Sequence, residues 1–219
     1  MRQSRLQNNY FFHTKEPKYL IFMHKIGITG GIGSGKSTAC RLFELLNIPI
    51  YYADQRAKWL MAHDPALKMA IQDLLGEASY SKEGQLNRAY IAQEVFQNHS
   101  KLEALNGIVH PAVGLDRERW QMEQEGNGAP YSLSEIAILF ESGLQEQFDR
   151  VITVYAPLEL RIQRVMKRDG AEREGVLARI RKQMPDEQKL KLADYILYND
   201  GEQPLIPQVW QLHQQLLQL

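Results

Sequence analysis

Five glycines and one lysine lie within the twelve residues GITGGIGSGKST, at positions 27–38. Glycine allows a backbone to adopt positive φ and to approach an anion without a clash at Cβ, so the N–H groups of such a loop can surround phosphate oxygens. Residues 30–37 fit the pattern G-x-x-x-x-G-K-S/T, in which the lysine reaches the β- and γ-phosphates and the serine hydroxyl binds Mg²⁺. The predicted nucleotide contacts are Gly31, Ile32, Gly33, Ser34, Gly35, Lys36, Ser37 and Thr38, and Ser37 is also the predicted Mg²⁺ ligand.

The residues around the loop narrow the class of protein. An apolar run precedes the loop and a helical stretch follows it, which a merely flexible glycine turn does not explain. A third glycine in the register G-x-G-x-x-G is missing, which disfavours a nicotinamide dehydrogenase. The chain lacks the guanine-reading Asn-Lys-x-Asp motif, and AILFES ends in a lone Glu141 where an ATP-driven motor would show an Asp-Glu pair. A small kinase that moves the γ-phosphoryl of ATP to a bound acceptor remains.

Such a kinase needs a second group at the acceptor hydroxyl, and Asp54 is the best candidate. It ends the apolar run IPIYYAD, and in parallel folds the carboxyl end of a strand faces the active crevice. A carboxylate there can accept the hydroxyl proton and help to hold hydrated Mg²⁺. The alternative is a helix N-cap for QRAKWLM, because Asp is a favoured cap, and the two roles can coexist.

Three arginines form a second candidate group. Arg161, Arg164 and Arg168 lie in one helical run, and the last two share a face. Guanidinium groups can close over a nucleotide and neutralise charge on the transferred group, but a solvated basic face fits the spacing equally well. His110, taken alone, fits a cap or core histidine better than a catalytic one, and the lone Cys40 fits a buried structural thiol.

Composition bounds the class and location of the protein. The 219 residues carry 26 basic and 26 acidic side chains, so the overall charge points neither to nucleic acid nor to a membrane surface. One cysteine cannot form an internal disulfide, and we expect a cytoplasmic protein. The run YLIFM is too short to span a bilayer. We interpret residues 1–22 as a disordered extension or a misassigned start, and residues 23–219 as one domain.

The order of elements predicts an α/β fold. Mostly continuous apolar runs suit strands covered on both faces, as in a parallel sheet with helices on each side. Between Asp54 and Ser134 no convincing strand is present, so we expect a mostly helical insertion over about 55–130, with helices that begin at Pro65, capped by Asp64, and at Pro111. The predicted strands are HKIGITG, IPIYYAD, SEIAILFES, RVITVYAP and DYILYND, at 24–30, 48–54, 134–142, 150–157 and 194–200.

Taken together, these motifs resemble those of the dephospho-CoA kinase family. The resemblance covers nearly everything from Met23 onward, and the HP pair combined with the ending AD-x-x-x-x-N-x-G is its most particular part. It rests on GITGGIGSGKST, on YYAD with Asp54, on His110-Pro111, on AILFE with Glu141, on Arg164 and Arg168, on Gln183, and on LADYILYNDG at 192–201. It implies a P-loop NTPase fold similar to that of nucleoside monophosphate kinases, with a five-stranded parallel sheet.

The resemblance also implies a reaction and residue roles. The reaction is ATP-dependent phosphorylation of the ribose 3′-hydroxyl of dephospho-CoA, with Mg²⁺, in a monomer or weak homo-oligomer. The insertion would bind the acceptor, and residues 158–186 would form a lid. The implied catalytic residues are Asp54 as base, Lys36 and Arg168; Arg164, Asn199 and Gly201 would contact ATP, and Asp54, Arg88, His110 and Glu141 the acceptor.

Two departures and two alternatives remain. The extension before Met23 has no counterpart in the family, and Tyr52 stands where the family often has a smaller or aliphatic residue. A kinase for another small hydroxyl compound, a nucleoside or a sugar acid, would keep Asp54 and the lid. A non-catalytic nucleotide-binding regulator would keep the loop without needing Asp54.

Overall fold

A computed structural model describes residues 23–96 and 98–219 of the protein. The extension expected at residues 1–22 lies outside the described residues. Five strands form one sheet in the order β2-β3-β1-β4-β5, and every pair of neighbours is parallel. The strands are β1 (His24–Thr29), β2 (Ile50–Tyr52), β3 (Tyr131–Glu135), β4 (Arg150–Tyr155) and β5 (Tyr195–Tyr198). The five-stranded parallel α/β fold predicted from the sequence is confirmed.

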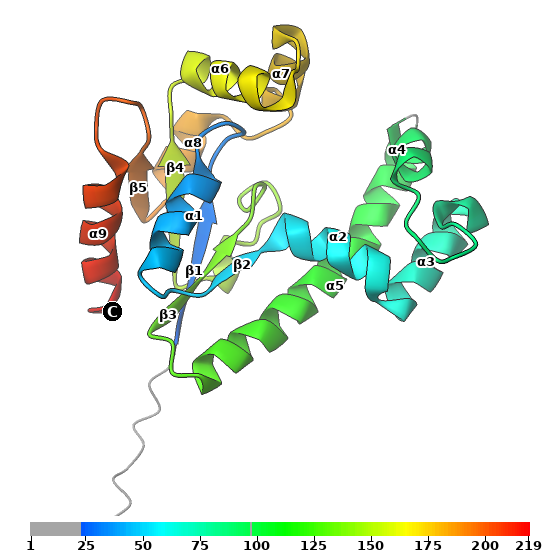
Figure 1. Cartoon of the computed structure of the whole chain (residues 1–219), viewed down its shortest axis with the longest axis horizontal. Helices are drawn as coiled ribbons and strands as arrows, with labels where there is room; N and C mark the ends of the chain where they lie inside the picture. Colours follow the sequence, from blue (N-terminus) through cyan, green and yellow to red (C-terminus); the bar gives the residue numbers. More distant parts are fainter. Residues whose placement is uncertain (1–22, 97) are drawn as a thin grey trace, which may run out of the picture.

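Helices connect the strands and cover the sheet (Figure 1). They are α1 (Lys36–Leu45), α2 (Ala53–His63), α3 (Pro65–Leu75), η1 (Glu77–Ser79), α4 (Arg88–Phe96), α5 (His99–Gly126), η2 (Gln145–Gln147), α6 (Leu158–Asp169), α7 (Arg173–Ile180), α8 (Asp186–Leu192) and α9 (Leu205–Leu216). No helix in the described part of the chain is both long and apolar enough to cross a membrane.

Two predicted strand boundaries are wrong. β2 ends at Tyr52 because the chain turns directly into α2 at Ala53. The third strand spans 131–135, whereas 134–142 was expected. Its serines, Ser132 and Ser134, are fully buried but look like loop residues in the sequence, while the apolar segment that follows Glu135 folds into turns.

The two faces of the sheet are packed differently. On one face, side chains such as Ile26 and Ile28 pack against α1 and α9. On the other face, the turns after β3 supply Leu139 and Phe140 to the core. Leu139 packs directly on β1, because a Cβ on Gly27 would lie 2.6 Å from its Cδ1. The apolar run that looked like a strand is therefore a cover for the sheet.

The segment between β2 and β3 has a core of its own, made by α2, α3, α4 and α5. The predicted start of α3 is confirmed, since the Asp64 carboxylate accepts a hydrogen bond from Leu67 N at 2.8 Å. The start predicted at Pro111 is wrong, because Pro111 lies inside α5, which begins at His99 after the cap Asn98. Proline keeps a helical φ and removes one N–H donor, and packing of α5 against α2, α3 and α4 outweighs that loss.

Candidate active site

The glycine loop connects the end of β1 to the start of α1, as the sequence predicted. Lys36 is the first residue of the helix, and Gly35 before it has φ +96°. A Cβ at Gly35 would lie 2.0 Å from Nδ2 of Asn199, so a side chain at this position meets both backbone strain and a clash. Because α1 begins directly after the loop, the backbone N–H groups at its N-terminal end point toward the loop. Such an arrangement favours the binding of anions.

Lys36 and Glu135 form the charged centre beside the loop. The Lys36 ammonium donates to the carbonyl oxygen of Gly30 at 2.9 Å and lies 3.9 Å from a carboxylate oxygen of Glu135. Burial lowers the pKa of Lys36, and the charge of Glu135 opposes that shift. Burial also raises the pKa of Glu135, which Lys36 opposes and the nearby Asp54 reinforces. The Lys36 ammonium and the Glu135 carboxylate therefore share one partly dehydrated site, with the exposed Asp54 nearby.

Asp54 lies in the first turn of α2. The N-cap position belongs to Tyr52, whose side chain makes no cap hydrogen bond. The helix-cap alternative for Asp54 is therefore wrong, because β2 passes straight into α2 and leaves Asp54 one residue inside the helix.

Two cavities meet at Asp54. One, of about 600 Å³, is lined by the loop, Lys36, Ser37 and Glu135. The other, of about 700 Å³, lies along α5 and the turns after β3, and its wall is mostly apolar. Asp54 is the only residue in the described part of the chain that lines both. A carboxylate at this junction can contact a group in either cavity.

The arginines of α6 have three different environments. Arg161 is 2% exposed; it donates through Nε to the Ile32 carbonyl at 2.9 Å and forms an ion pair with Asp186. Arg164 donates to the carbonyl of Asn199 at 3.0 Å. Arg168 lines the loop cavity and is paired with Asp169, with a side chain 62% exposed. A solvated basic face therefore describes Arg168 in part and does not describe Arg161.

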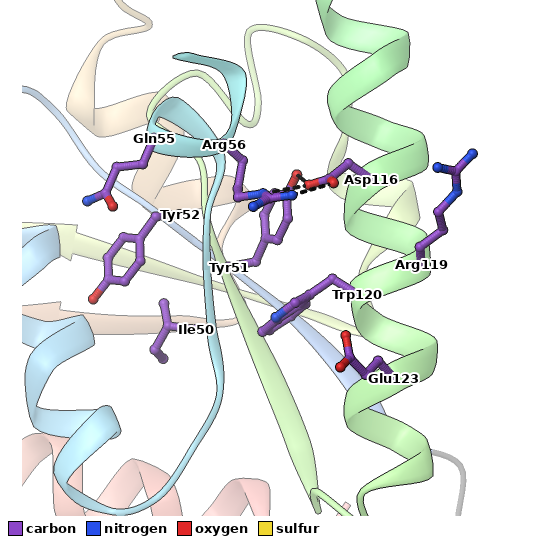
Figure 2. Close-up of a pocket in the computed structure, with 9 residues that line it drawn as sticks. All are labelled: Ile50, Tyr51, Tyr52, Gln55, Arg56, Asp116, Arg119, Trp120 and Glu123. Atoms are coloured by element: carbon purple, nitrogen blue, oxygen red, sulfur yellow. Dashed lines mark hydrogen bonds and ion pairs between the residues drawn. The ribbon is translucent and has the colours of Figure 1, made fainter. Parts of the chain in front are cut away.

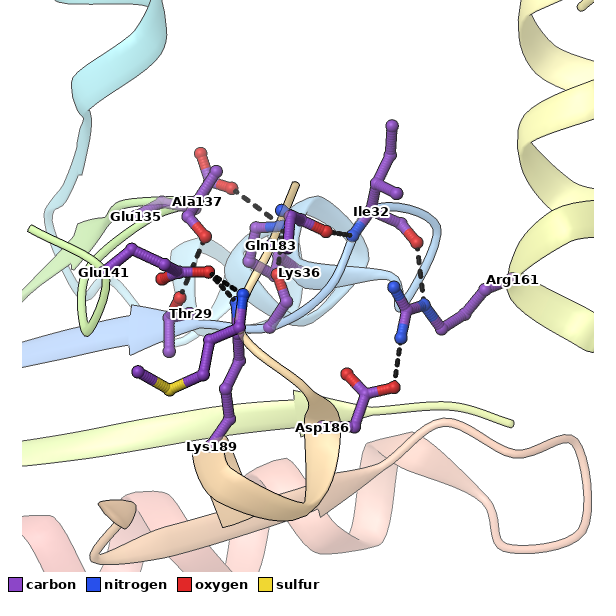
Figure 3. Close-up of polar contacts among 12 residues, drawn as sticks. Thr29, Ile32, Lys36, Glu135, Ala137, Glu141, Arg161, Gln183, Asp186 and Lys189 are labelled. Carbon is purple, nitrogen blue, oxygen red and sulfur yellow. Dashed lines mark hydrogen bonds and ion pairs between the residues drawn. The ribbon is translucent and has the colours of Figure 1, made fainter. Parts of the chain in front are cut away.

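Residues far along the chain hold the glycine loop from outside. The side-chain oxygen of Gln183 accepts from Ile32 N at 2.8 Å, while Arg161 binds the Ile32 carbonyl (Figure 3). Asn199, just after β5, donates through Nδ2 to the Ser34 carbonyl at 2.8 Å. The segments around α6, α8 and β5 thus help to shape the loop.

A partly buried cluster fixes α2, and with it Asp54, against α5. The Arg56 guanidinium binds both oxygens of Asp116, at 2.8 and 2.6 Å, and the Tyr51 hydroxyl donates to the same carboxylate at 2.7 Å (Figure 2). The hydrogen bonds from Arg56, and to a smaller extent the one from Tyr51, lower the pKa of Asp116. Trp120 packs against Tyr51, with ring centroids 5.4 Å apart. The cluster joins the end of β2 to the middle of α5.

The arrangement matches a known family of kinases. Residues 24–204 match the family model described as dephospho-CoA kinase. A dephospho-CoA kinase of Bacteroides fragilis is 43% identical over 188 residues, which cover 86% of this chain and 90% of that protein. The chain belongs to the dephospho-CoA kinase family. A second relative, the dephospho-CoA kinase of Porphyromonas gingivalis, is 41% identical and covers 85% of this chain and 91% of its own.

Solved structures share the fold of this chain. A Thermus thermophilus protein of known crystal structure is 36% identical, with a TM-score of 0.75, and the match covers 88% of this chain and 97% of that one. A dephospho-CoA kinase from Campylobacter jejuni shares the fold at 24% identity, with a TM-score of 0.62 and 89% and 98% coverage. The enzyme is a dephospho-CoA kinase and catalyses ATP-dependent formation of coenzyme A, as the motifs indicated.

The residues expected to bind the acceptor do not all converge in this kinase. His110 is an exposed residue of α5 that lines the cavity along that helix, so it is neither a cap nor a core histidine. Arg88 begins α4 on the surface and lines neither cavity. Glu141 lies 2.7 Å from the buried Lys189 ammonium and accepts from Met184 N (Figure 3). For Arg88 and Glu141, acceptor binding stays a prediction.

Glu135 is the site residue that sequence reasoning missed. It ends β3 next to the loop, the position that the misplaced strand assigned to Glu141. The segment YSLSE contained the signal. An acidic residue at the end of a strand that lies beside the glycine loop is close to the lysine of that loop. Buried serines concealed the strand.

Proposed function

We propose that the cavity at the glycine loop holds ATP, that the cavity along α5 holds dephospho-CoA, and that Asp54 accepts the proton of the ribose 3′-hydroxyl. The observation that carries this proposal is the position of Asp54 at the junction of the two cavities. A general base must lie within hydrogen-bond reach of the proton that it takes. In this arrangement the acceptor oxygen and the γ-phosphoryl approach each other beside the Asp54 carboxylate.

The loop residues stabilise the phosphates. Backbone N–H groups of residues 33 and 35–37, at the N-terminal end of α1, face the phosphate oxygens, while the N–H of Ile32 stays bonded to Gln183. Lys36 moves its donor from the Gly30 carbonyl to the β- and γ-phosphates. Glu135 keeps the Lys36 ammonium in place beside the loop. Arg168, which lines the same cavity, neutralises charge that develops on the transferred group.

Mg²⁺ fits the oxygen groups of the loop cavity. Its expected ligand is the Ser37 hydroxyl, and Asp54 and Glu135 line the same cavity as carboxylates able to bind its water. In the described residues no cluster of three or more His, Cys, Asp or Glu side chains forms a cage, which suits an ion that keeps several waters and binds substrate phosphates. When bound, the ion shields phosphate charge.

The remaining roles follow the family pattern. Arg164 donates to the Asn199 carbonyl, and the Asn199 side chain donates to the Ser34 carbonyl. Both residues lie where they can support bound ATP, with Gly201 just beyond Asn199. We propose that residues 158–186 close over ATP and exclude water. A cytoplasmic location and a monomeric or weakly oligomeric state without nucleic-acid or membrane partners complete the proposal, and the single cysteine, free and buried, is consistent with a reducing compartment.

The Asp54→Asn variant tests the proposal. We expect kcat for ADP release with dephospho-CoA to fall at least about 100-fold, the scale of a general base, while the Kd for ATP changes less than about threefold. The matched control is Asp73→Asn, which removes an exposed carboxylate on α3. An Asp54→Asn enzyme with near-normal kcat refutes the proposed base. Identification of the product by NMR as a phosphate ester at a carbon other than 3′ refutes the proposed geometry.

A further inference from the structure

Arg117 of α5 is a buried cation with an incomplete set of partners. The residue as a whole is only 5% exposed. One terminal nitrogen donates to the side-chain oxygen of Gln147, and the guanidinium lies 4.9 Å from the centre of the Phe148 ring. Its Nε is buried without a hydrogen-bond partner among residues 23–96 and 98–219. Buried polar nitrogens are nearly always paired, so this one requires an explanation.

Arg117 differs from two other buried cations, which each form an ion pair. Arg161 is paired with Asp186 and Lys189 with Glu141. Arg117 forms no ion pair with any residue in the described part of the chain, and Glu118 beside it is exposed. Burial accordingly lowers the pKa of Arg117. A buried charge without a counter-charge is costly, and proteins retain one where a ligand supplies the missing charge.

The position of Arg117 indicates which ligand that is. Arg117 lines the cavity along α5 together with Asp54, and it is not part of the wall of the glycine-loop cavity. Arg117 is therefore not placed to bind the phosphates of ATP in the glycine-loop cavity. The rest of the α5 cavity is mostly apolar, which suits an acceptor that is uncharged apart from one anionic group.

We infer that Arg117 binds the diphosphate of the acceptor. Dephospho-CoA consists of an adenosine and a pantetheine arm, both uncharged, joined by a diphosphate, and that group is the only negative charge the acceptor brings to this cavity. A guanidinium presents several N–H donors in a planar fork that matches phosphate oxygens. The inference rests on the proposed function, because it places the acceptor in the cavity along α5.

The chain offers a matched pair of variants. Arg117→Met removes the charge and keeps an unbranched apolar stem that can pack on Phe148. Arg117→Lys keeps the charge without the fork. Arg119→Met is the control, because Arg119 is an exposed arginine of the same helix that lines the neighbouring hollow of Figure 2 instead.

Calorimetric titration of each full-length variant with dephospho-CoA, and separately with ATP, tests the inference. We expect the Kd for dephospho-CoA to rise at least about 30-fold in Arg117→Met, as for other truncated buried charge pairs, and less than about tenfold in Arg117→Lys. In both Arg117 variants the Kd for ATP should stay within about threefold of wild type. In Arg119→Met both Kd values should stay within the same limit. The ligand-free melting temperature of Arg117→Met should equal or exceed that of wild type, because an uncompensated charge is gone.

A ³¹P NMR titration gives a second measurement, which compares the wild-type enzyme with Arg117→Lys. The diphosphate resonances of dephospho-CoA should shift on binding, and in Arg117→Lys at saturation they should shift differently. A change in the Kd for dephospho-CoA of less than about threefold in Arg117→Met overturns the inference. Equal weakening by Arg117→Met and Arg117→Lys, with a lowered melting temperature, also overturns it and assigns Arg117 to the packing of Gln147 and Phe148. The Asp54→Asn test measures kcat, whereas the tests of Arg117 measure binding. A failure of the proposed function is therefore distinguishable from a failure of the inference about Arg117.

Discussion

The side-chain oxygen of Gln183 accepts a hydrogen bond from the backbone N–H of Ile32 at 2.8 Å. Arg161 of α6 binds the carbonyl of the same residue. The backbone of Ile32 is therefore held on both sides, by α6 and by the segment before α8. The glycine loop therefore owes part of its shape to residues 129 and 151 positions further along the chain. Loss of one of these contacts should loosen the loop before it loosens the fold.

Gln183→Ala tests this contact. We expect KM for ATP to rise roughly tenfold, because a less ordered loop must be organised by the bound phosphates. Stability should fall by no more than about 1 kcal/mol, the net value of one ordinary hydrogen bond. Gln188→Ala, an exposed glutamine of α8, is the control for steady-state kinetics and urea unfolding. An unchanged KM for ATP in Gln183→Ala means that the loop is ordered without this bond.

Gly35→Ala tests the close approach of the loop to the β5 segment. Gly35 has φ +96°, and a Cβ there would lie 2.0 Å from Nδ2 of Asn199. We expect a loss of about 1–3 kcal/mol in the free energy of unfolding from backbone strain and a rise of at least about tenfold in KM for ATP. In Gly126→Ala, where a Cβ meets nothing within 4 Å, neither quantity should change. Equal behaviour of the two variants contradicts the described loop geometry.

The cluster of Arg56, Asp116 and Tyr51 predicts a pH dependence of stability. The pKa of Asp116 is lowered by its bonds to Arg56 and Tyr51, so the folded-state pKa lies below the unfolded value of about 3.9. The stabilisation is therefore complete above about pH 5 and is lost as the pH falls through the folded-state value. It contributes about 1–2 kcal/mol, because the Arg56 side chain is 38% exposed.

Urea unfolding of wild type and Asp116→Asn measures this contribution. The difference in the free energy of unfolding should be constant between pH 5 and pH 8 and smaller at pH 3.5. Asp73→Asn, which removes an exposed carboxylate of α3, should match wild type at each pH. A difference that grows on acidification contradicts the assigned pKa shift.

Much of the fold was predictable because the signals are local. The glycine loop, its lysine and the apolar runs on both sides identified β1, α1 and the parallel sheet, and Asp64 with Pro65 located α3. The strand order, in contrast, depends on contacts between distant segments, which a single sequence does not show.

The errors arose where tertiary packing overrides local pattern. The serines of β3 are polar yet buried, and Leu139 and Phe140 are apolar yet lie in turns that cover Gly27. Pro111 is normally a helix start but here lies inside α5. The role of Glu135 was lost with the misplaced strand, and the incomplete pairing of Arg117 became visible only when Gln147 and Phe148 were seen to be its partners.

A crystal structure of the kinase with a non-hydrolysable ATP analogue and dephospho-CoA would show directly whether Asp54 lies between the two substrates. We expect the phosphates at residues 31–38, the acceptor along α5, and a carboxylate oxygen of Asp54 at hydrogen-bond distance, about 2.6–3.2 Å, from the ribose 3′-oxygen. An acceptor bound elsewhere, or a 3′-oxygen beyond reach of Asp54 even through one water, contradicts this expectation.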